Sequence, residues 1–414
     1  MGARITESRP WHEAKVLVQN PRIYPHMERA GHNALVRDLM RDFASRTGLD
    51  PVSYRTHRYL WTDAFAVCNY LGLSESSGTP VYRDLAIRLV GQVHTILGRY
   101  RDDDFRNGWI SGLSESEGKN RPTAGGLRIG KDLPERQPGE TEIEREEWDR
   151  DGQYYHYLTR WMHALCRVAS VTGDRNMISW AIELAQTAHA KFTYLPPGGR
   201  TKRMYWKMST DLRRPLVYSM GQHDALDGFV TYNEISATAE KLGLGTDILG
   251  NETAEMTTIC QGLVLATDDP LGIGGLLCDA FQIVTSAKKG VPAHSSLLES
   301  VLVSARAGLE SFSRSGTVSA PARYRLGFRE LGLSLGLAAA IKLHEELSDG
   351  AKIFANRESL HRAVQALQKF LPLRDEIDAF WLDEKNRTGG TWEDHRDINE
   401  VMLATSLAPD GYLA

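Results

Sequence analysis

Residues Gly152–Phe192 read GQYYHYLTRWMHALCRVASVTGDRNMISWAIELAQTAHAKF, which is two helical patterns separated by a short turn. Apolar residues recur at three- and four-residue spacing over 152–172 and again over 175–192, as they do on one face of an α-helix. Gly173 and Asp174 between the two runs are typical of a helix end followed by a new start. This stretch therefore predicts a helical hairpin.

The same apolar spacing continues through the rest of the chain. It predicts further helices at about 33–47, 55–72, 80–99, 222–243, 252–267, 275–288, 293–313, 326–347, 357–371 and 395–406. Alternating patterns are almost absent, although runs such as 203–207 and 317–320 could be loop or minor strand. The predicted fold class is all-α, with about a dozen helices that come in pairs.

Residues 101–150 are a long polar stretch with little helical character. A loop of this length usually means function or disorder, and aromatic anchors such as Trp109 and Trp148 argue against a fully solvated segment. No linker rich in Pro, Gly or Ser divides the chain. We therefore expect one domain over residues 1–414, with a functional loop at 101–150.

Composition excludes several classes of partner. The 414 residues carry a formal net charge of −4 and no basic stripe, so neither nucleic acid nor an anionic membrane surface is an expected partner. The segment Met1–Lys15 has no apolar core, so we expect no secretory signal. The most apolar run, Leu331–Leu343, is too short to span a bilayer. The expected location is the cytoplasm.

The cysteine pattern fits that location. The four cysteines are dispersed, and each lies in a mostly apolar helical stretch: Cys68, Cys166, Cys260 and Cys278. We expect buried, reduced thiols rather than a disulfide or zinc framework. No cofactor or metal site is expected, because no Walker A, HExxH or GxSxG motif is present.

Several predicted helices begin with polar and aromatic residues and become apolar afterwards. Examples are 55–63, Asp151–Tyr157 and Gln222–Asp227. A dozen or so paired helices with such clusters at alternate starts resemble the (α/α)6 toroid of six-hairpin glycosidases and N-acylglucosamine 2-epimerase relatives. The resemblance covers most of the chain as a pattern. It implies an (α/α)6 barrel with long loops at one end and a carbohydrate as substrate, and it transfers no catalytic residue.

The first candidate cluster contains His57, Trp61 and Asp63. Trp61 could stack on a sugar ring while His57 and Asp63 hydrogen-bond to hydroxyl groups. The alternative is an ordinary helix start with a solvated Asp and a core Trp.

The second candidate cluster contains Asp151, Gln153, His156 and Tyr157. Asp151 could simply cap the helix, and a role as an acid would require burial to raise its pKa. A cap alone does not explain the ring and amide groups beside it.

The third candidate cluster contains Trp206, Arg213, Gln222, His223 and Asp227. His223 and Asp227 are i,i+4 neighbours on a helix, so Asp227 can orient His223. That pair suits acid–base catalysis, and it also suits a solvated helix start. Near the C-terminus, Trp392 and His395 repeat the pattern, although such residues can also serve to dock the end of a chain.

The leading functional hypothesis is a glycoside hydrolase, which needs two carboxylates. We expect Asp151 and Asp227 to be that pair, in one pocket that also takes in Trp61, Gln153, His156, Trp206, His223 and His395 and is covered by the 101–150 loop. The alternative in the same fold is a sugar epimerase or isomerase, in which histidines such as His156 and His223 move a proton.

Two further classes remain open. A cyclase of the α-toroid type would have an apolar cavity, and a helical peptide-binding scaffold would have an open superhelix with a concave groove.

Overall fold

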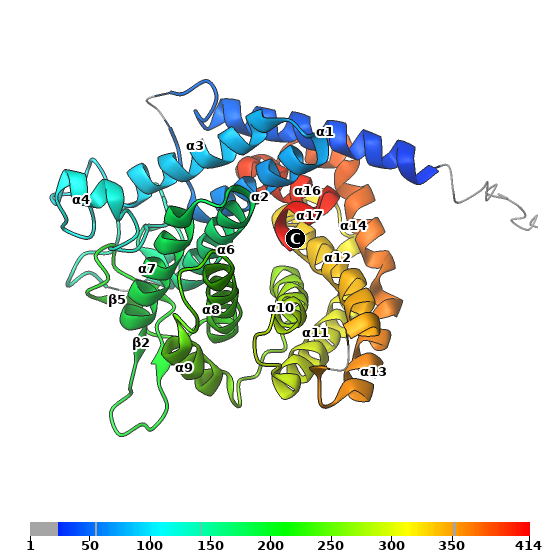
Figure 1. Cartoon of the computed structure of the whole chain (residues 1–414). Coiled ribbons are helices and arrows are strands. Elements are labelled where there is room, and N and C mark those ends of the chain that lie inside the picture. Colours follow the sequence, from blue (N-terminus) through cyan, green and yellow to red (C-terminus); the bar gives the residue numbers. More distant parts are fainter. Residues whose placement is uncertain (1–23, 54–55, 142, 351–352) are drawn as a thin grey trace, which may run out of the picture.

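Six helices form a closed inner ring in the computed structural model, which describes residues 24–53, 56–141, 143–350 and 353–414. They are α2 (Leu60–Ser77), α6 (Tyr155–Thr172), α8 (Asp224–Lys241), α10 (Pro270–Lys288), α12 (Gly327–Gly350) and α16 (Arg396–Leu407). Each packs against the next in this order, and α16 packs against α2 (Figure 1). The segment Met1–Lys15, in which no secretory signal is expected, lies outside the described residues.

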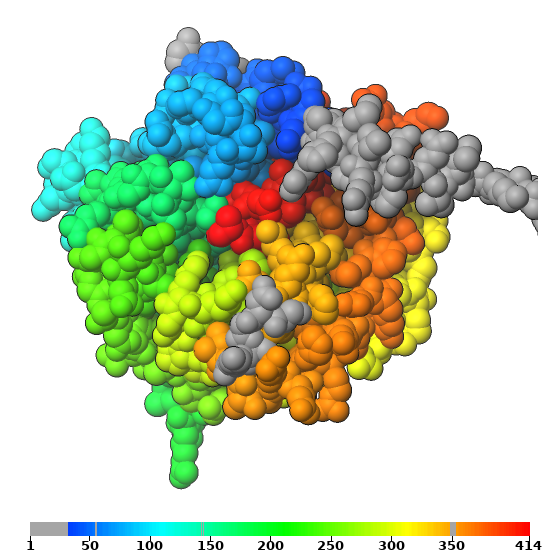
Figure 2. Space-filling model, turned by 45° about the vertical axis from the view of Figure 1, so that its right-hand side comes forward, coloured from blue at the N-terminus to red at the C-terminus, as the bar shows by residue number. Residues whose placement is uncertain are grey.

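A second layer of helices covers this ring. It contains α1 (Tyr24–Arg46), α3 (Pro80–Leu97), α7 (Arg175–Phe192), α9 (Gly250–Cys260), α11 (Ser295–Ser315), α13 (Arg357–Leu367) and α14 (Pro372–Leu382). Five of them pair with the inner helix next to them in sequence, whereas α1 pairs with α16 from the other end of the chain. In Figure 2 the C-terminal segment (red) accordingly lies between the first helices (blue) and the later ones (yellow).

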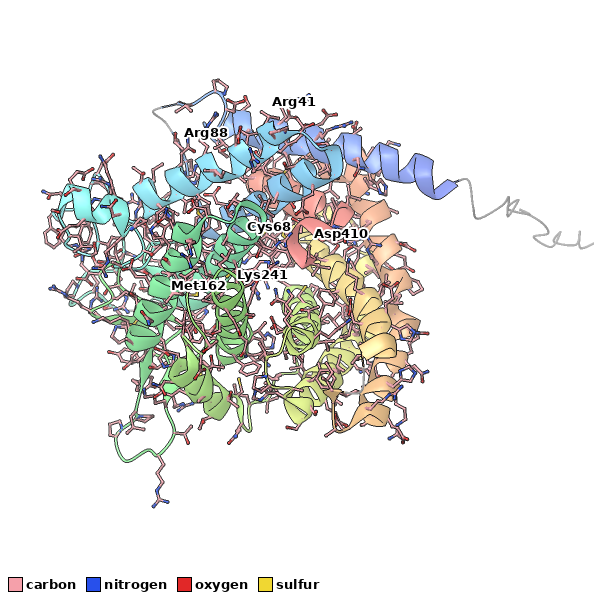
Figure 3. All side chains as sticks on the ribbon, viewed as in Figure 1. Arg41, Cys68, Arg88, Met162, Lys241 and Asp410 are labelled. Atoms are coloured by element: carbon pink, nitrogen blue, oxygen red, sulfur yellow. The ribbon has the colours of Figure 1, made fainter. Side chains whose placement is uncertain are left out.

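The two layers follow from composition. Inner helix α2 buries residues all round, including Asn69, whereas outer helix α3 buries only one face along Leu85, Leu89 and Val93. Figure 3 shows the same division, with Cys68 inside the ring and Arg88 at the outer surface.

The predicted helices are all present, with ends shifted by a few residues for most and α1 beginning nine residues before its predicted start. The helix α14 was not predicted, and it begins at Pro372. In the structure this proline is at the first helical position, where its missing N–H costs no hydrogen bond.

Glycines allow α10 and α12 to approach closely. A Cβ on Gly274 would lie 2.1 Å from the carbonyl oxygen of Gly332, and one on Gly336 would lie 2.5 Å from the Cα of Gly274. The glycine cluster at 272–275 therefore serves helix packing.

Strands are a small minority of the described chain. Three short ones form a sheet beside the start of α6: β1 (Gln153–Tyr154), β4 (Lys207–Met208) and β5 (Pro215–Val217). The strands β2 (Thr193–Tyr194) and β3 (Arg203–Met204) pair in a hairpin that protrudes from the body (Figures 1 and 2). The run at 317–320 forms a 3-10 helix, Thr317–Ser319.

The remaining short helices lie in the connections and near the C-terminus. They are α4 (Glu115–Asn120), α5 (Glu144–Glu147), α15 (Thr391–Asp394), α17 (Asp410–Leu413) and the 3-10 turns Ala322–Tyr324, Gln368–Phe370 and Glu384–Arg387.

The four cysteines are buried and unpaired, as predicted. Among the described helices, α10 alone is long and apolar enough to cross a membrane by composition, but 67% of it is buried inside the protein. Its position in the inner ring accounts for that apolar character.

A buried ion pair inside the ring makes stability depend on pH. His163 Nδ1 lies 2.8 Å from Glu234 Oε2, and its Nε2 donates to the carbonyl oxygen of Tyr412 at 3.0 Å. Burial acts to lower the pKa of His163, but the Glu234 carboxylate and the Cys68 side chain together outweigh it, and the pKa rises to about 10. The folded state therefore holds this proton more tightly than the unfolded chain, in which the pKa of histidine is about 6.5.

We expect this pair to stabilise the fold fully below about pH 6.5 and to lose its contribution as the pH rises towards 10, by at most about 1.4 kcal/mol per pH unit. The measurement is the free energy of unfolding by urea at pH 6 and pH 9.5, for the wild-type chain and His163→Gln. The difference between the two proteins should shrink at the higher pH, and a difference that grows would contradict the assignment.

Candidate active site

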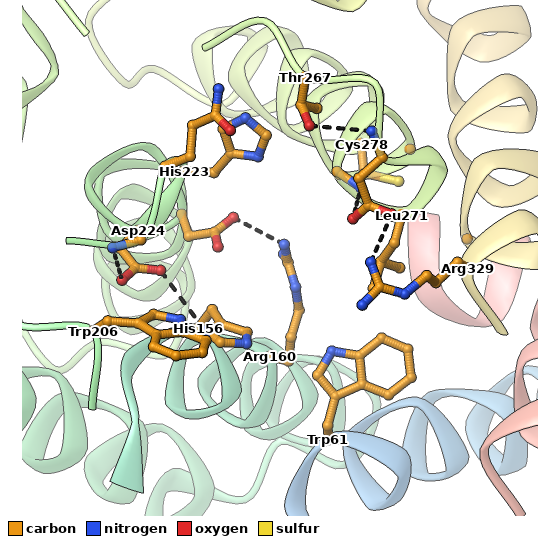
Figure 4. A pocket seen from close by; sticks show the side chains of 18 of the residues that line it. Trp61, His156, Arg160, Trp206, His223, Asp224, Thr267, Leu271, Cys278 and Arg329 are labelled. Carbon is orange, nitrogen blue, oxygen red and sulfur yellow. Dashed lines mark hydrogen bonds and ion pairs between the residues drawn. The ribbon is translucent and has the colours of Figure 1, made fainter. Parts of the chain in front are cut away.

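A cavity of about 540 Å³ lies where the inner helices begin. The first turns of five inner helices contribute side chains to it: Trp61 from α2, His156 and Arg160 from α6, Asp224 and Asp227 from α8, Leu271 from α10 and Arg329 from α12 (Figure 4). Polar residues near the starts of α6, α8 and α12 therefore meet in one cavity.

Two carboxylates occupy the first turn of α8. Asp224 and Asp227 are three residues apart, so both side chains lie on the same side of the helix. Asp227 Oδ1 accepts a hydrogen bond from Arg160 Nη2 at 2.8 Å. Asp224 Oδ2 accepts one from the backbone N–H of Gly221 at 3.2 Å, and Asp224 Oδ1 lies 3.7 Å from His156 Nδ1. The two carboxyl groups thus have different neighbours.

These neighbours set different protonation states. Burial, together with the negative charge of Asp227, raises the pKa of Asp224 well above 3.8. Burial lowers the pKa of His156 to about 4. These shifts favour the neutral acid form of Asp224 and leave His156 a neutral imidazole at pH 7, while the Asp227 carboxyl group lies against the permanent cation of Arg160.

A third carboxyl group lies beside Arg160. Asp279 on α10 is 1% exposed, and its Oδ1 is 4.0 Å from Arg160 Nη1. Burial and the charge of Asp227 raise the pKa of Asp279 well above 3.8. Arg160 therefore lies between Asp227, with which it forms a hydrogen bond, and Asp279, whose neutral form is favoured.

Three tryptophans line the same cavity. Trp206 lies parallel to the His156 ring, with centroids 6.4 Å apart and an interplanar angle of 7°. Trp148 packs edge-on against Trp206 at 4.6 Å. Trp61 lies on the other side of Arg160 and packs against Phe65 (Figure 4). Flat aromatic faces of this kind suit the apolar C–H faces of a sugar.

Some of the residues proposed from sequence line this cavity: Trp61, His156, Trp206, Gln222, His223 and Asp227. His223 Nε2 donates to the carbonyl oxygen of Leu265 at 2.8 Å, and it is not paired with Asp227. Asp227 instead accepts a hydrogen bond from Arg160.

Asp151 does not line the cavity. Its carboxylate is fully buried, where it accepts hydrogen bonds from Arg128 at 2.9 Å and from the backbone N–H groups of Gly130 and Gly152, each at 3.0 Å. These contacts fasten the long loop to the start of β1. The carboxylate beside Asp227 in the cavity is Asp224, and it replaces Asp151 in the pair.

Gln153 has a similar structural place. Its side-chain oxygen accepts from the N–H of Leu127 at 2.9 Å, and its nitrogen donates to the carbonyl oxygen of Thr210 at 2.7 Å. Tyr157, outside the cavity lining as well, shares a 2.6 Å hydrogen bond with Tyr59.

The remaining proposed residues lie outside the cavity lining. Asp63 is buried in an ion pair with Arg58 at 3.0 Å and caps α2 through the N–H of Tyr59. Trp392 is buried and stacks on Trp381 at 5.1 Å. Three others are exposed: His57, Arg213 and His395.

The 101–150 loop contributes one residue, Trp148, to the cavity among its described positions. The rest is held by ion pairs instead of covering the site. Arg106, for example, bridges Asp104 at 2.8 Å, Glu135 at 2.6 Å and Asp211 at 3.2 Å. Its polar composition is therefore largely explained by these internal pairs.

Arg160 was not among the residues proposed from sequence, and Asp224 was left out of the proposed carboxylate pair. Both had a helical signal: Arg160 is four residues after His156 and Asp224 is three before Asp227, so each shares a helix side with a proposed residue. Trp148 was named as an aromatic anchor of the 101–150 loop, and Arg329 stands near the start of the helix predicted at 326–347, but neither was proposed as a site residue.

No metal cluster is evident in this part of the protein. Among the described residues, no group of three or more His, Cys, Asp or Glu side chains is placed to hold a metal ion.

Comparison with solved structures agrees with the ring of paired helices. An α-mannanase of Bacteroides thetaiotaomicron, from family GH76, superposes with a TM-score of 0.53 over 93% of this chain and 98% of that chain, at 10% identity. The chain has the (α/α)6 toroid fold. A cellobiose 2-epimerase from Spirochaeta thermophila aligns with a TM-score of 0.46 at 11% identity, over 91% of this chain and 97% of that one.

A sugar epimerase from a ruminal bacterium aligns with a TM-score of 0.47 at 10% identity, over 84% of this chain and 87% of that one. At these identities the similarity concerns the fold alone. The sequence matches no family model and no curated protein.

Proposed function

We propose that the protein is a glycoside hydrolase in which Asp224 is the general acid and Asp227 is the carboxylate that faces the anomeric carbon. One observation carries this proposal: two carboxyl groups, one with a pKa raised by burial and one ion-paired with Arg160, lie three residues apart in a cavity lined by tryptophans. Glycosidases need two carboxyl groups in different protonation states. Surroundings that give the two groups different pKa values therefore indicate which group is the acid and which is its partner.

In the proposed reaction Asp224 gives its proton to the glycosidic oxygen as the bond from that oxygen to the anomeric carbon breaks. Asp227 stabilises the positive charge that develops on the sugar ring. Water then adds to the anomeric carbon, and its released proton returns to Asp224. The products are two sugars with new hydroxyl groups, and the enzyme regains its starting protonation state.

Arg160 has a supporting role in this proposal. Its 2.8 Å hydrogen bond fixes the orientation of the Asp227 carboxyl group and places a permanent positive charge beside it. His156, 3.7 Å from Asp224, is neutral at pH 7 and can hydrogen-bond to a sugar hydroxyl without competing for the acid's proton.

A sugar epimerase is the second candidate, and His156 is the reason to retain it. A neutral imidazole can accept a proton from carbon beside a carbonyl group, and Asp224 could supply one. That reaction exchanges a C–H hydrogen with solvent, whereas hydrolysis leaves the C–H bonds intact.

One experiment separates the two. The full chain is incubated in D₂O with α-linked manno-oligosaccharides, which are chosen because the α-mannanase shares the fold, and with free monosaccharides and cellobiose. We expect new reducing ends from the oligosaccharides and no deuterium on carbon, by mass spectrometry and NMR. Deuterium incorporation without cleavage would establish the epimerase and overturn the hydrolase.

A further inference from the structure

Trp148 and Trp206 form a pair of rings at the cavity, here called the tryptophan platform. Their centroids are 4.6 Å apart and their planes meet at 66°. Trp148 is 48% exposed although it is a large apolar side chain, so much of its surface is free to meet a ligand. Tyr154 supports Trp206 from another side, with centroids 4.9 Å apart.

Buried charges hold the platform in place. Lys207, next to Trp206 in sequence, is fully buried, and its Nζ lies 3.3 Å from Glu147 Oε2 and donates to the carbonyl oxygen of Arg150 at 2.8 Å. Glu147, next to Trp148, is also ion-paired with Arg136. These contacts tie the two tryptophan segments together, so the exposed ring is carried on a rigid support.

The platform lies on the acid's side of the cavity. Trp206 is parallel to the ring of His156, and His156 is 3.7 Å from Asp224. Figure 4 shows these three side chains together, with Trp61 across the cavity beyond Arg160. A general acid must reach the oxygen that leaves, so the departing part of the substrate lies on the acid's side.

We propose that the tryptophan platform binds the leaving-group sugar of a glycan of at least two units. This inference rests on the proposed function, because it assumes that Asp224 protonates the leaving oxygen. The sugar that keeps the anomeric carbon then lies towards Trp61, Arg160 and Asp227. A planar indole face against the C–H face of a sugar is the contact that such a subsite needs.

The test compares Trp148→Ala with the wild-type chain on two probes. The first is α-mannotriose, whose leaving group is a sugar. The second is α-mannosyl fluoride, whose leaving group is a fluoride ion that occupies no sugar subsite. We expect kcat/KM for mannotriose to fall about tenfold, the effect of losing one stacking contact, and kcat/KM for the fluoride to stay within about twofold.

Two further variants control the result. Trp148→Phe keeps a flat ring and should restore most of the activity on mannotriose. Tyr324→Ala removes a 69%-exposed aromatic ring that does not line the cavity, and it should change neither probe. Equal losses on both probes, or no loss on mannotriose, would overturn the inference.

Failure of the proposed function is recognised separately. If the chain cleaves neither probe, calorimetric titration of mannotriose into the wild type and into Trp148→Ala tests whether the tryptophan platform binds sugar, independently of hydrolysis. Weaker binding by Trp148→Ala would support sugar binding at the platform without hydrolysis. Equal binding, or no binding to the wild type, would overturn it.

Discussion

Asp227→Asn is expected to lower kcat for glycoside cleavage by a factor of about 10² to 10⁴, because the carboxylate that stabilises the sugar cation becomes a neutral amide. The substitution keeps the shape of the side chain. Asp279 lies 4.0 Å from Arg160 and the amide oxygen of the introduced asparagine can still accept from it, so we expect the guanidinium to keep polar neighbours and the chain to fold. Steady-state kinetics on manno-oligosaccharides and a thermal melt measure the two effects.

Asp268→Asn is the matched control for this variant. Asp268 is an exposed carboxylate near the start of α10, and it does not line the cavity. It should retain wild-type kcat. If Asp227→Asn also kept its activity while folding normally, Asp227 would not be the group that faces the anomeric carbon.

Asp151→Ala is expected to lower the free energy of unfolding by about 3 kcal/mol or more, since it leaves a buried cation and two N–H groups without their acceptor. The cation is Arg128, whose Nη1 donates to the Asp151 carboxylate at 2.9 Å. Arg101 also approaches this carboxylate, at 3.9 Å. Urea unfolding followed by circular dichroism measures the change.

Asp149→Ala provides the comparison, because Asp149 is an exposed carboxylate two residues earlier in the same segment. The free energy of unfolding of the Asp149→Ala protein should stay within about 0.5 kcal/mol of that of the wild type. A stable Asp151→Ala protein with greatly reduced activity would instead return Asp151 to the catalytic role first expected of it.

The fold was predictable because helical periodicity is a local property. The spacing of apolar residues over 152–172 and 175–192 needs no knowledge of the rest of the chain, and both segments are helices with nearly those bounds. The helix α14 was missed although Pro372 stands at its first position, because a proline there is compatible both with the end of one helix and with the start of another.

The site was predictable only in part, because burial and pairing are set by residues distant in sequence. Asp151 and Asp227 both stand near helix starts, so the sequence offers no way to tell them apart. In the structure, the Asp151 carboxylate accepts hydrogen bonds from Arg128 and from the backbone of the 127–130 segment. The Asp227 carboxylate lines the cavity and accepts a hydrogen bond from Arg160 on a neighbouring helix. The helix-start pattern pointed to the end of the barrel at which the cavity lies, but it did not single out Asp224.

The order in which the ring is assembled has a consequence for the synthesis of this protein. The inner helix α2 packs against α16, and Asn69 Nδ2 donates to the carbonyl oxygen of Val401 at 3.0 Å. These two residues are 332 positions apart, so a ribosome working at about 5 to 20 residues per second needs roughly 15 to 70 seconds to make the partner of α2. Throughout that interval the face of α2 that packs against α16 lacks its native neighbour, and exposed apolar surface of this kind favours aggregation.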